Sequence, residues 1–235
     1  MLALSGLTKR FGGVVAVQDV SFDMARGEIV GLIGPNGAGK TTLFNLISGH
    51  IRPDAGAARF GSIDLARRNA PACAEAGVGR TFQIVKPLGT LTVLENVVVG
   101  ALLRNDLRQA RRKAAAIVER VGMGALMHRR ASSLTLESRK RLEVARALST
   151  EPRLLLLDEI LAGLTPTEVN ESLALIRSFA SEGLGVIMIE HILHAVMSLA
   201  DRVVVLDFGM KIAEGTPADI VRDEKVIAAY LGSDA

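Results

Sequence analysis

The chain has 235 residues, of which 49% are hydrophobic and 23% charged, and its formal net charge is +3. This balance supplies a globular core and excludes a disordered chain. The longest stretches without Asp, Glu, Lys or Arg, 29–39 and 41–51, are shorter than the roughly 20 apolar residues of a membrane-spanning helix. A single cysteine, Cys73, excludes an internal disulfide, and residues 1–10 lack the pattern of a signal peptide, so a cytoplasmic location is expected.

Basic residues cluster at 104–113 and at 129–141. Such clusters can bind nucleic acid or anionic lipid headgroups, but they are also typical of solvated helix faces. With no Trp, one Tyr and seven Phe, the chain has few rings on which bases could stack. The composition therefore favours a solvated face and predicts no nucleic-acid partner.

Short apolar segments separated by turns predict strands in the N-terminal part of the chain, at 14–17, 20–22 and 28–33. A helix is expected from Thr41 to about Ser48, where Gly49 ends it. A glycine-rich segment lies between the last of these strands and this helix.

Three consecutive helices are predicted in the middle of the chain. Thr92 and Glu95 form the capping-box pattern that opens an apolar helix reaching about Leu103. Residues 107–121 and 137–149 follow as two more helical stretches. Because these helices lie between strand-rich segments, they predict a helical subdomain inserted at about 88–148.

The C-terminal part alternates apolar strands, at 154–157, 186–189 and 203–206, with helices. Residues 165–168 combine an N-cap, a proline at the first helical position and a capping Glu, and so predict a helix that ends near Gly183. A further helical segment separates the last two strands. This alternation is typical of a parallel sheet covered on both faces, so the predicted fold class is α/β.

The glycine-rich segment fits the pattern G-x-x-x-x-G-K-[ST] at every fixed position. Glycines let the main chain wrap around phosphate oxygens, and the following helix directs the positive end of its dipole at them. Lys40 would supply a cation to the β- and γ-phosphates, and the Thr41 hydroxyl would be a ligand of Mg²⁺. The sequence therefore predicts a nucleoside triphosphate site made by Gly34, Pro35, Asn36, Gly37, Ala38, Gly39, Lys40, Thr41 and Thr42.

A carboxylate at the end of a neighbouring strand would complete this site. The four leucines at 154–157 predict a strand that delivers Asp158 to the edge of the sheet, with Glu159 immediately after it. A carboxylate beside a γ-phosphate can orient and deprotonate the attacking water. The chain has no Asn-Lys-x-Asp tetrad of the kind that reads guanine, so ATP is favoured over GTP.

These residues resemble those of the ATP-binding subunits of ABC (ATP-binding cassette) transporters, over almost the whole chain. Gln83 is similar to the family's Q-loop glutamine, which reaches Mg²⁺ and the water, and His191 to its switch histidine at the γ-phosphate. Phe11 looks like the aromatic residue that stacks on adenine, with simple packing as the alternative. The resemblance implies Lys40, Gln83, Glu159 and His191 as catalytic residues and Thr41, Gln83 and Asp158 as ligands of Mg²⁺.

The resemblance also implies a fold, namely a P-loop NTPase (RecA-like) core with an N-terminal antiparallel β subdomain and an inserted α-helical subdomain. Residues 1–235 would form a single ABC ATPase domain. The core and the β subdomain would comprise 1–87 and 149–235, and the helical subdomain, which carries the family's signature, would comprise 88–148.

Within the family, the chain is similar to the ATP-binding subunits of bacterial importers for branched-chain (hydrophobic) amino acids. The segments that carry this likeness are 92–96, 142–148, 162–164, 166–168, 199–209 and 212–217. The likeness implies a peripheral protein at the cytoplasmic face of the inner membrane. It also implies polytopic membrane permease subunits as direct partners and a periplasmic or extracellular substrate-binding protein as an indirect one.

Three departures from the family pattern bear on assembly. The signature Leu-Ser-Gly-Gly-Gln is replaced at 134–138, where Glu137 adds bulk and a negative charge facing phosphate. Ile160 stands where the family usually has Pro, and Thr165 where it has Asp or Asn. In the family the signature binds ATP held by the other subunit of a dimer, and the residues concerned here are Thr135, Leu136, Glu137 and Ser138. A heterodimer with a second ATPase that carries an intact signature is therefore expected.

Three alternatives remain open from the sequence. The importer could carry another small solute, such as urea, a short amide or an aromatic acid. The chain could be a soluble ABC-type ATPase acting on nucleic acid or the ribosome. The altered signature also suits a nucleotide-dependent regulatory subunit with little hydrolysis of its own.

Overall fold

The computed structural model describes residues 1–83 and 86–231. A central six-stranded sheet runs through the molecule in the order β10-β9-β3-β8-β7-β6. All neighbouring strands in it are parallel except β9 and β10. Its strands are β3 (Ile29–Ile33), β6 (Val78–Arg80), β7 (Leu154–Asp158), β8 (Gly185–Ile189), β9 (Arg202–Asp207) and β10 (Met210–Gly215). The predicted α/β class with a parallel sheet is confirmed.

The central sheet is apolar on both faces because helices cover both. Every residue of β3, β7 and β8 is buried. Successive leucines of β7 point to opposite sides, since Leu155 and Leu157 join one hydrophobic core and Leu154 and Leu156 another. This two-sided burial explains the unbroken leucine run of the sequence.

A second, antiparallel sheet has the order β2-β1-β4-β5. Its strands are β1 (Leu2–Phe11), β2 (Val14–Met24), β4 (Ala55–Phe60) and β5 (Ile63–Asp64). The two separate strands predicted at 14–17 and 20–22 are one strand, β2. The prediction was wrong because Asp19, at φ 51°, lies at an irregularity in the pairing with β1, and this polar interruption looks like a turn in the sequence.

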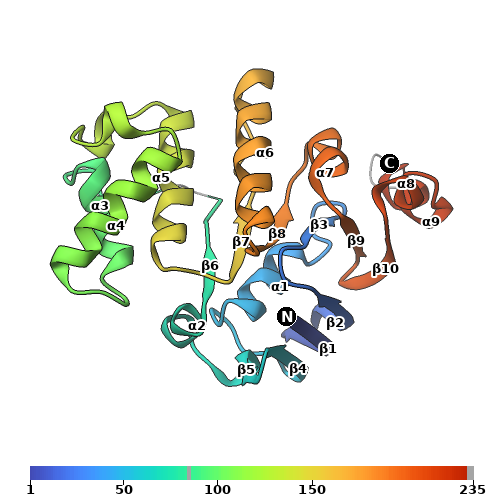
Figure 1. Cartoon of the computed structure of the whole chain (residues 1–235). Coiled ribbons are helices and arrows are strands. Elements are labelled where there is room, and N and C mark those ends of the chain that lie inside the picture. Colours follow the sequence, from blue (N-terminus) through green and yellow to red (C-terminus); the bar gives the residue numbers. More distant parts are fainter. Residues whose placement is uncertain (84–85, 232–235) are drawn as a thin grey trace.

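Helices pack on the central sheet from both sides (Figure 1). They are α1 (Lys40–Ile47), α2 (Ala70–Ala76), α6 (Pro166–Ser181), α7 (Leu193–Leu199), α8 (Pro217–Ile220) and α9 (Glu224–Leu231), with short 3₁₀ turns at Leu65–Arg67, Gly124–Leu126 and Ala131–Ser133. The predicted capping box of α6 is present, because Thr165 and Glu168 exchange side-chain and main-chain hydrogen bonds.

Three helices form a group at one side of the molecule, which we call the helical layer: α3 (Val93–Ala101), α4 (Leu107–Arg120) and α5 (Leu136–Ser149) (Figure 1). The predicted Thr92–Glu95 capping box opens α3, although this helix ends at Ala101 rather than near Leu103. Small and branched residues of the layer, such as Ala114 and Val118, share one core with Leu155 and Leu157 of the sheet. Helix α5 of the layer packs against β7, the strand that ends at Asp158.

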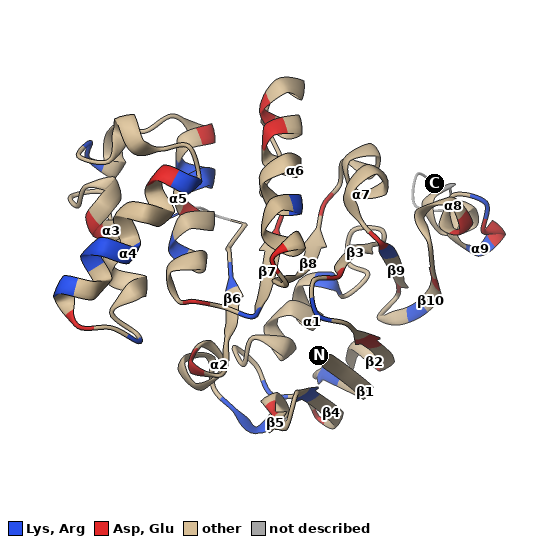
Figure 2. Ribbon diagram, in the orientation of Figure 1, with Lys and Arg blue, Asp and Glu red and all other residues tan. Residues whose placement is uncertain are grey.

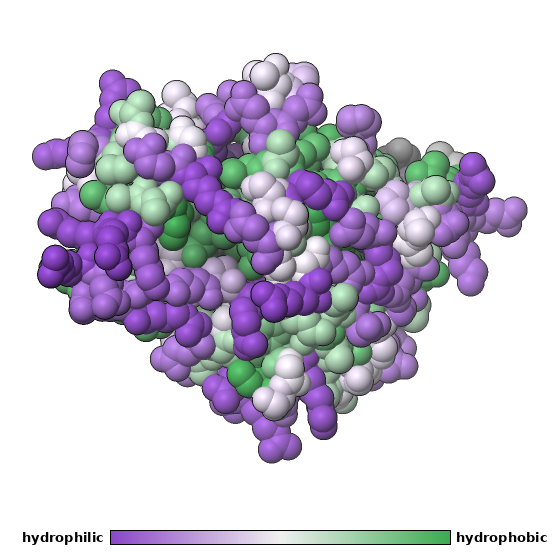
Figure 3. Space-filling view, viewed as in Figure 1, coloured by the Kyte–Doolittle hydropathy of each residue, from purple (hydrophilic) through white to green (hydrophobic). Residues whose placement is uncertain are grey.

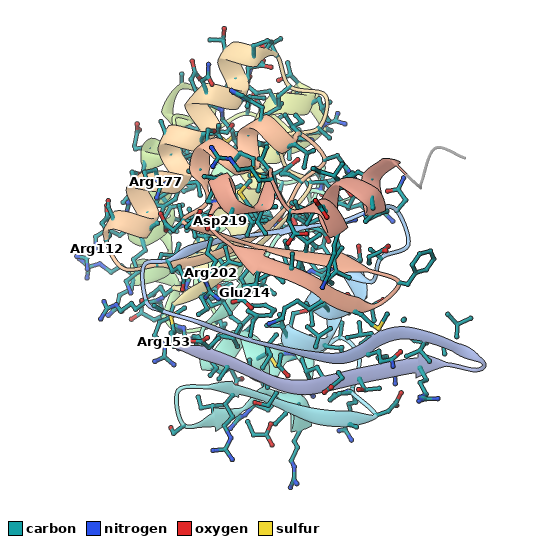
Figure 4. All side chains as sticks on the ribbon, turned by 90° about the vertical axis from the view of Figure 1, so that its right-hand side faces the viewer. Arg112, Arg153, Arg177, Arg202, Glu214 and Asp219 are labelled. Atoms are coloured by element: carbon teal, nitrogen blue, oxygen red, sulfur yellow. The ribbon has the colours of Figure 1, made fainter. Side chains whose placement is uncertain are left out.

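Charged side chains lie mainly on the outside of this fold. Figure 2 shows Lys and Arg on α4, where Arg108, Arg111 and Arg112 are exposed, and Figure 3 shows a hydrophilic surface over the same side. Arg202 and Glu214 lie together on β9 and β10 in Figure 4, where they form an ion pair. Within the described residues, no helix combines the length and apolar character that crossing a membrane requires.

Asn96 on α3 is fully buried and fastens the chain segment that leads into the helical layer. Its Nδ2 donates to the carbonyls of Leu88 (3.1 Å) and Thr92 (2.9 Å), and its Oδ1 accepts from the Leu88 amide (2.9 Å). Buried polar groups that lose such partners are costly.

We expect Asn96→Ala to lower the free energy of unfolding by about 2–4 kcal/mol, because the Leu88 main chain would lose its partners. Urea unfolding measures this loss. The matched control is Asn105→Ala, which removes bonds to Ala101 and Glu151 at a half-exposed position and should cost about 1 kcal/mol or less. Equal losses in the two variants would contradict the role of Asn96 in holding the Leu88 main chain.

Candidate active site

Four neighbouring parallel strands bring the predicted site residues to one edge of the central sheet. Strands β3, β8, β7 and β6 lie side by side, and Leu32 and Asp158 both pair with Ile189 of β8. The residues that follow these strands therefore emerge next to one another. They include the glycine-rich loop after β3 and the side chains of Gln83, Glu159 and His191.

The glycine-rich loop fits only glycine at two positions. Gly34 has φ 148°, and a Cβ there would lie 2.0 Å from the Leu206 carbonyl oxygen. Gly39 has φ 97°, and a Cβ there would lie 2.3 Å from the Ala16 carbonyl oxygen. The loop is thus seated between β9 and β2, and α1 begins directly after it at Lys40. The first amide groups of a helix have no partner within the helix, so those of α1 are suited to an anion.

Lys40 is only 7% exposed, and its ammonium folds back onto the loop. Its Nζ donates to the carbonyls of Gly34 (2.7 Å) and Pro35 (2.8 Å). Burial lowers the pKa of Lys40, while the nearby carboxylates of Glu159 and Asp158 favour its charged form. Thr41, exposed, and Thr42, half-exposed, follow on the first turn of α1. The structure thus gathers the predicted phosphate-binding residues in one loop and helix start.

Asp158 is 2% exposed and is held by Arg80, whose Nη2 lies 3.2 Å from Asp158 Oδ2. Burial raises the pKa of Asp158, and Arg80 opposes that shift. The other oxygen, Oδ1, is buried without a hydrogen-bond partner among the described residues. An unpartnered buried carboxylate oxygen suits a cation, so the donor set fits Mg²⁺.

The part of the chain that the structure describes holds no group of three or more His, Cys, Asp or Glu side chains placed for a metal ion. Mg²⁺ in nucleotide sites is held by one or two protein oxygens together with phosphates and water. Asp158 and the Thr41 hydroxyl match that type of site.

Glu159 is the centre of a three-residue contact. Gln83 Nε2 donates to Glu159 Oε2 (2.6 Å), and His191 Nε2 lies 2.7 Å from Glu159 Oε1. The structure therefore brings together three of the predicted catalytic residues, which come from the ends of three different strands. Each oxygen of the Glu159 carboxylate thus has one side-chain partner.

Phe11 lies at the end of β1, apart from this contact, and its ring is 50% exposed. The Lys9 ammonium lies 5.5 Å from the centroid of that ring. The expected stacking of Phe11 on adenine stays a prediction.

The segment in the place of the signature opens helix α5. Thr135 is the N-cap, and its Oγ1 accepts from the Ser138 amide (3.3 Å), while the Leu136 side chain is exposed. Glu137 is paired with Arg141 one helical turn later, with 2.7 Å between Glu137 Oε1 and Arg141 Nε. Its charge is therefore partly compensated, a feature that the sequence analysis did not anticipate.

Three further charged residues lie at the site, and sequence reasoning missed their roles. Arg80 holds Asp158 and packs its guanidinium over Phe44 and Phe82. Lys140 and Glu190 are buried behind Glu159. The only signal in the sequence was that Glu190 directly follows an apolar strand, whereas Lys140 lies in the basic run 139–141. Neither pattern tells a buried charge from an exposed one.

Comparison with known proteins agrees with this geometry. The family model described as ABC transporter matches residues 17–162, and one described as branched-chain amino acid ATP-binding cassette transporter matches residues 210–235. The chain is 38% identical to the high-affinity branched-chain amino acid transport ATP-binding protein BraF of Pseudomonas aeruginosa, over 99% of this chain and 98% of that protein. The chain belongs to the ABC transporter ATP-binding family.

Other members of the ABC family are similar over the same length. LivG of Escherichia coli K12, which carries the same functional description as BraF, is 38% identical, with 99% and 98% coverage. The lipopolysaccharide export system protein LptB of the same organism is 35% identical, also with 99% and 98% coverage. The crystal structure of the ADP conformation of an ABC transporter cassette has a TM-score of 0.90 at 30% identity, with 99% and 98% coverage. This ABC subunit is accordingly an ATPase, and its relatives serve more than one transport system.

Glu190 provides a test of the site's electrostatics. Burial raises its pKa from 4.5 to about 7, and the Leu161 amide and Lys140 oppose that shift. Between pH 4.5 and about pH 7, Glu190 holds a proton in the folded chain that it releases in the unfolded chain. The free energy of unfolding therefore falls as pH rises through this window.

Glu190→Gln removes this titration, so the variant should gain about 1–3 kcal/mol over the wild type between pH 5 and pH 8. Urea unfolding of both proteins at the two pH values measures the difference. A constant difference between the proteins would contradict the raised pKa.

Proposed function

We propose that this chain is the ATP-hydrolysing subunit of a bacterial importer for branched-chain or other hydrophobic amino acids. The observation that carries the proposal is the near-full-length identity to BraF and LivG, both described as branched-chain amino acid transport proteins. The match of residues 210–235 to the branched-chain family model supports it at the C-terminal end. Permease subunits in the inner membrane would be the direct partners, with this chain at the cytoplasmic face.

In this proposal the triphosphate of ATP lies on the glycine-rich loop and the first turn of α1. Lys40 leaves the Gly34 and Pro35 carbonyls and donates to phosphate oxygens, while the free amides of α1 donate to the same group. Mg²⁺, held by Thr41, Gln83 and Asp158, would neutralise phosphate charge. Phe11 would stack on adenine.

Hydrolysis needs a water molecule held in line with the γ-phosphate. Glu159 accepts a proton from that water, and His191 and Lys40 stabilise the charge on the transferred group. Gln83 and His191 each contact one oxygen of Glu159, and the remaining lone pairs of the carboxylate can accept from water.

Two ATPase subunits would close around the nucleotides, each presenting its 135–138 segment to the ATP of the other. Thr135 keeps a hydroxyl at the start of α5, whereas Leu136 and Glu137 replace glycines. A homodimer would have two impaired sites, whereas pairing with a second ATPase that carries an intact signature would leave one good site and one degenerate site, so we propose a heterodimer. The domain division at 88–148 fits the packing of the helical layer and remains part of this proposal.

We expect Glu159→Gln to leave ATP affinity within about twofold and to lower the hydrolysis rate by about 10²–10⁴, because the amide cannot accept the proton. Nucleotide binding and phosphate release in the assembled complex measure the two effects. Glu75→Gln, at an exposed position on α2, is the control and should hydrolyse normally. Wild-type hydrolysis by Glu159→Gln would exclude Glu159 as the base.

Glu137→Gln tests the altered signature because it removes the charge and keeps the size. We expect turnover of the assembled complex to rise about two- to fivefold, a modest gain since Arg141 already compensates part of the charge. Glu171→Gln removes the other carboxylate on Arg141 and should leave turnover unchanged. An unchanged rate in Glu137→Gln would count against an inhibitory charge.

The transport assignment is tested by affinity purification of the tagged chain from detergent-solubilised native membranes. Two polytopic membrane proteins and a second ATPase should co-purify. Uptake of labelled leucine by vesicles that hold the complex should depend on ATP. Recovery of an export complex, or of soluble partners or nucleic acid alone, would contradict the importer while leaving the ATPase intact.

A further inference from the structure

The turn that follows β7, residues 159–162, has an unusual main-chain conformation. Glu159 has φ 50°, in the left-handed region that non-glycine residues rarely adopt. Its amide donates to the Ile189 carbonyl (2.9 Å) at the end of the neighbouring strand. Such a conformation persists only where the surroundings fix it, and it directs the side chain of Glu159 toward Gln83 and His191.

Lys140 fixes this turn from the side of the helical layer. It lies on α5, one turn after the Glu137 of the signature segment, and is only 7% exposed. Its Nζ donates to the carbonyl of Glu159 (3.2 Å) and to the carbonyl of Ala162. A single ammonium group thus holds both ends of the turn.

Glu190 fixes the same turn from the opposite side. It is 3% exposed and follows β8, directly before His191. Its Oε1 accepts from the Leu161 amide (2.8 Å), in the middle of the turn. Lys140 and Glu190 lie in one buried region, where burial disfavours the charged form of each and each favours the charged form of the other. Burying two ionisable groups costs hydration free energy, which the attraction between them does not reliably repay, so their presence suggests a function.

Ile160 explains why the turn needs these restraints. A proline at that position would lock its own φ near −65°, whereas Ile has no ring that fixes φ. The side-chain hydrogen bonds to the main chain of the turn come instead from Lys140 and Glu190, and the Glu159 amide bonds to the end of β8. Ile160 and Leu161 also pack into the core to which α5 contributes. The conformation of Glu159 therefore depends on where α5 lies.

We propose that Lys140 and Glu190 are positioning residues that set the main chain of Glu159 and couple its carboxylate to helix α5. The proposal rests on the proposed role of Glu159 as the base. Because Thr135 caps α5 and the helix begins at Leu136, a nucleotide bound by the partner against 135–138 would displace the helix that carries Lys140. Contact with the partner's nucleotide thereby adjusts the base of this chain's own site.

The test compares Lys140→Met, Glu190→Gln and the double variant in the assembled complex. Lys140→Met should lower kcat about tenfold and leave the KM for ATP within about twofold, since Lys140 contacts the turn and not the nucleotide. It also leaves Glu190 buried without its opposite charge, which can destabilise the fold. The double variant removes both charges, so its melting temperature should return toward that of the wild type while kcat stays low.

The double variant separates positioning from folding. If Lys140 and Glu190 served only stability, kcat would recover together with the melting temperature, and the proposal would be wrong. A wild-type kcat, or a raised KM alone, in Lys140→Met would also overturn it. Lys113→Met, which breaks an exposed ion pair with Glu151 in the same helical layer, is the control and should keep the wild-type kcat.

Glu159→Gln measured beside these variants distinguishes the two proposals. If Glu159→Gln is inactive and Lys140→Met is normal, only the positioning role fails. If Glu159→Gln hydrolyses ATP normally, the role of Glu159 fails first, and the coupling proposed here fails with it.

Discussion

The site depends on one constraint, that four parallel strands of the central sheet end at the same edge. The hydrogen-bonded register of the strands aligns their ends, because Leu32, Asp158 and Ile189 lie in one row across β3, β7 and β8. The next residue or two of each strand must then emerge together, whatever their distance along the chain. Few other arrangements place groups this far apart in sequence within hydrogen-bonding distance.

Several charged side chains lie at this edge of the sheet, and each has a partner elsewhere in the chain. Lys40 donates to two carbonyls, Arg80 pairs with Asp158, and Lys140 donates to the carbonyl of Glu159. Buried charges seldom add net stability, because the loss of hydration offsets the attraction between them. The buried charges of Lys40 and Asp158 at this edge are better explained by a highly charged ligand, and the unpartnered oxygen of Asp158 is consistent with that explanation.

The sequence allowed accurate prediction wherever the signal is local. The capping patterns at Thr92 and Thr165 gave correct helix starts, because each depends on residues only three positions apart. The antiparallel sheet was harder, since its strands are half-exposed and β2 is interrupted at Asp19. Strand β1 therefore had no prediction, and β2 was divided in two.

Within the site, too, local motifs could be predicted and long-range contacts could not. The glycine-rich loop is one continuous motif, and a family resemblance supplied Gln83 and His191. The contacts of Arg80, Lys140 and Glu190 join segments 78, 19 and 29 residues apart in the sequence. No periodicity in a single sequence records such contacts, which arise only when β6, α5 and β8 pack around β7. The pairing of Glu137 with Arg141 spans one helical turn, and it modifies the expected effect of the altered signature.

The most direct test of this account is a structure of the chain with Mg²⁺ and a non-hydrolysable ATP analogue. The account predicts that Lys40 Nζ leaves the Gly34 and Pro35 carbonyls for phosphate oxygens, and that the unpartnered oxygen of Asp158 faces the metal. A nucleotide bound elsewhere, with Lys40 still on those two carbonyls, would contradict it.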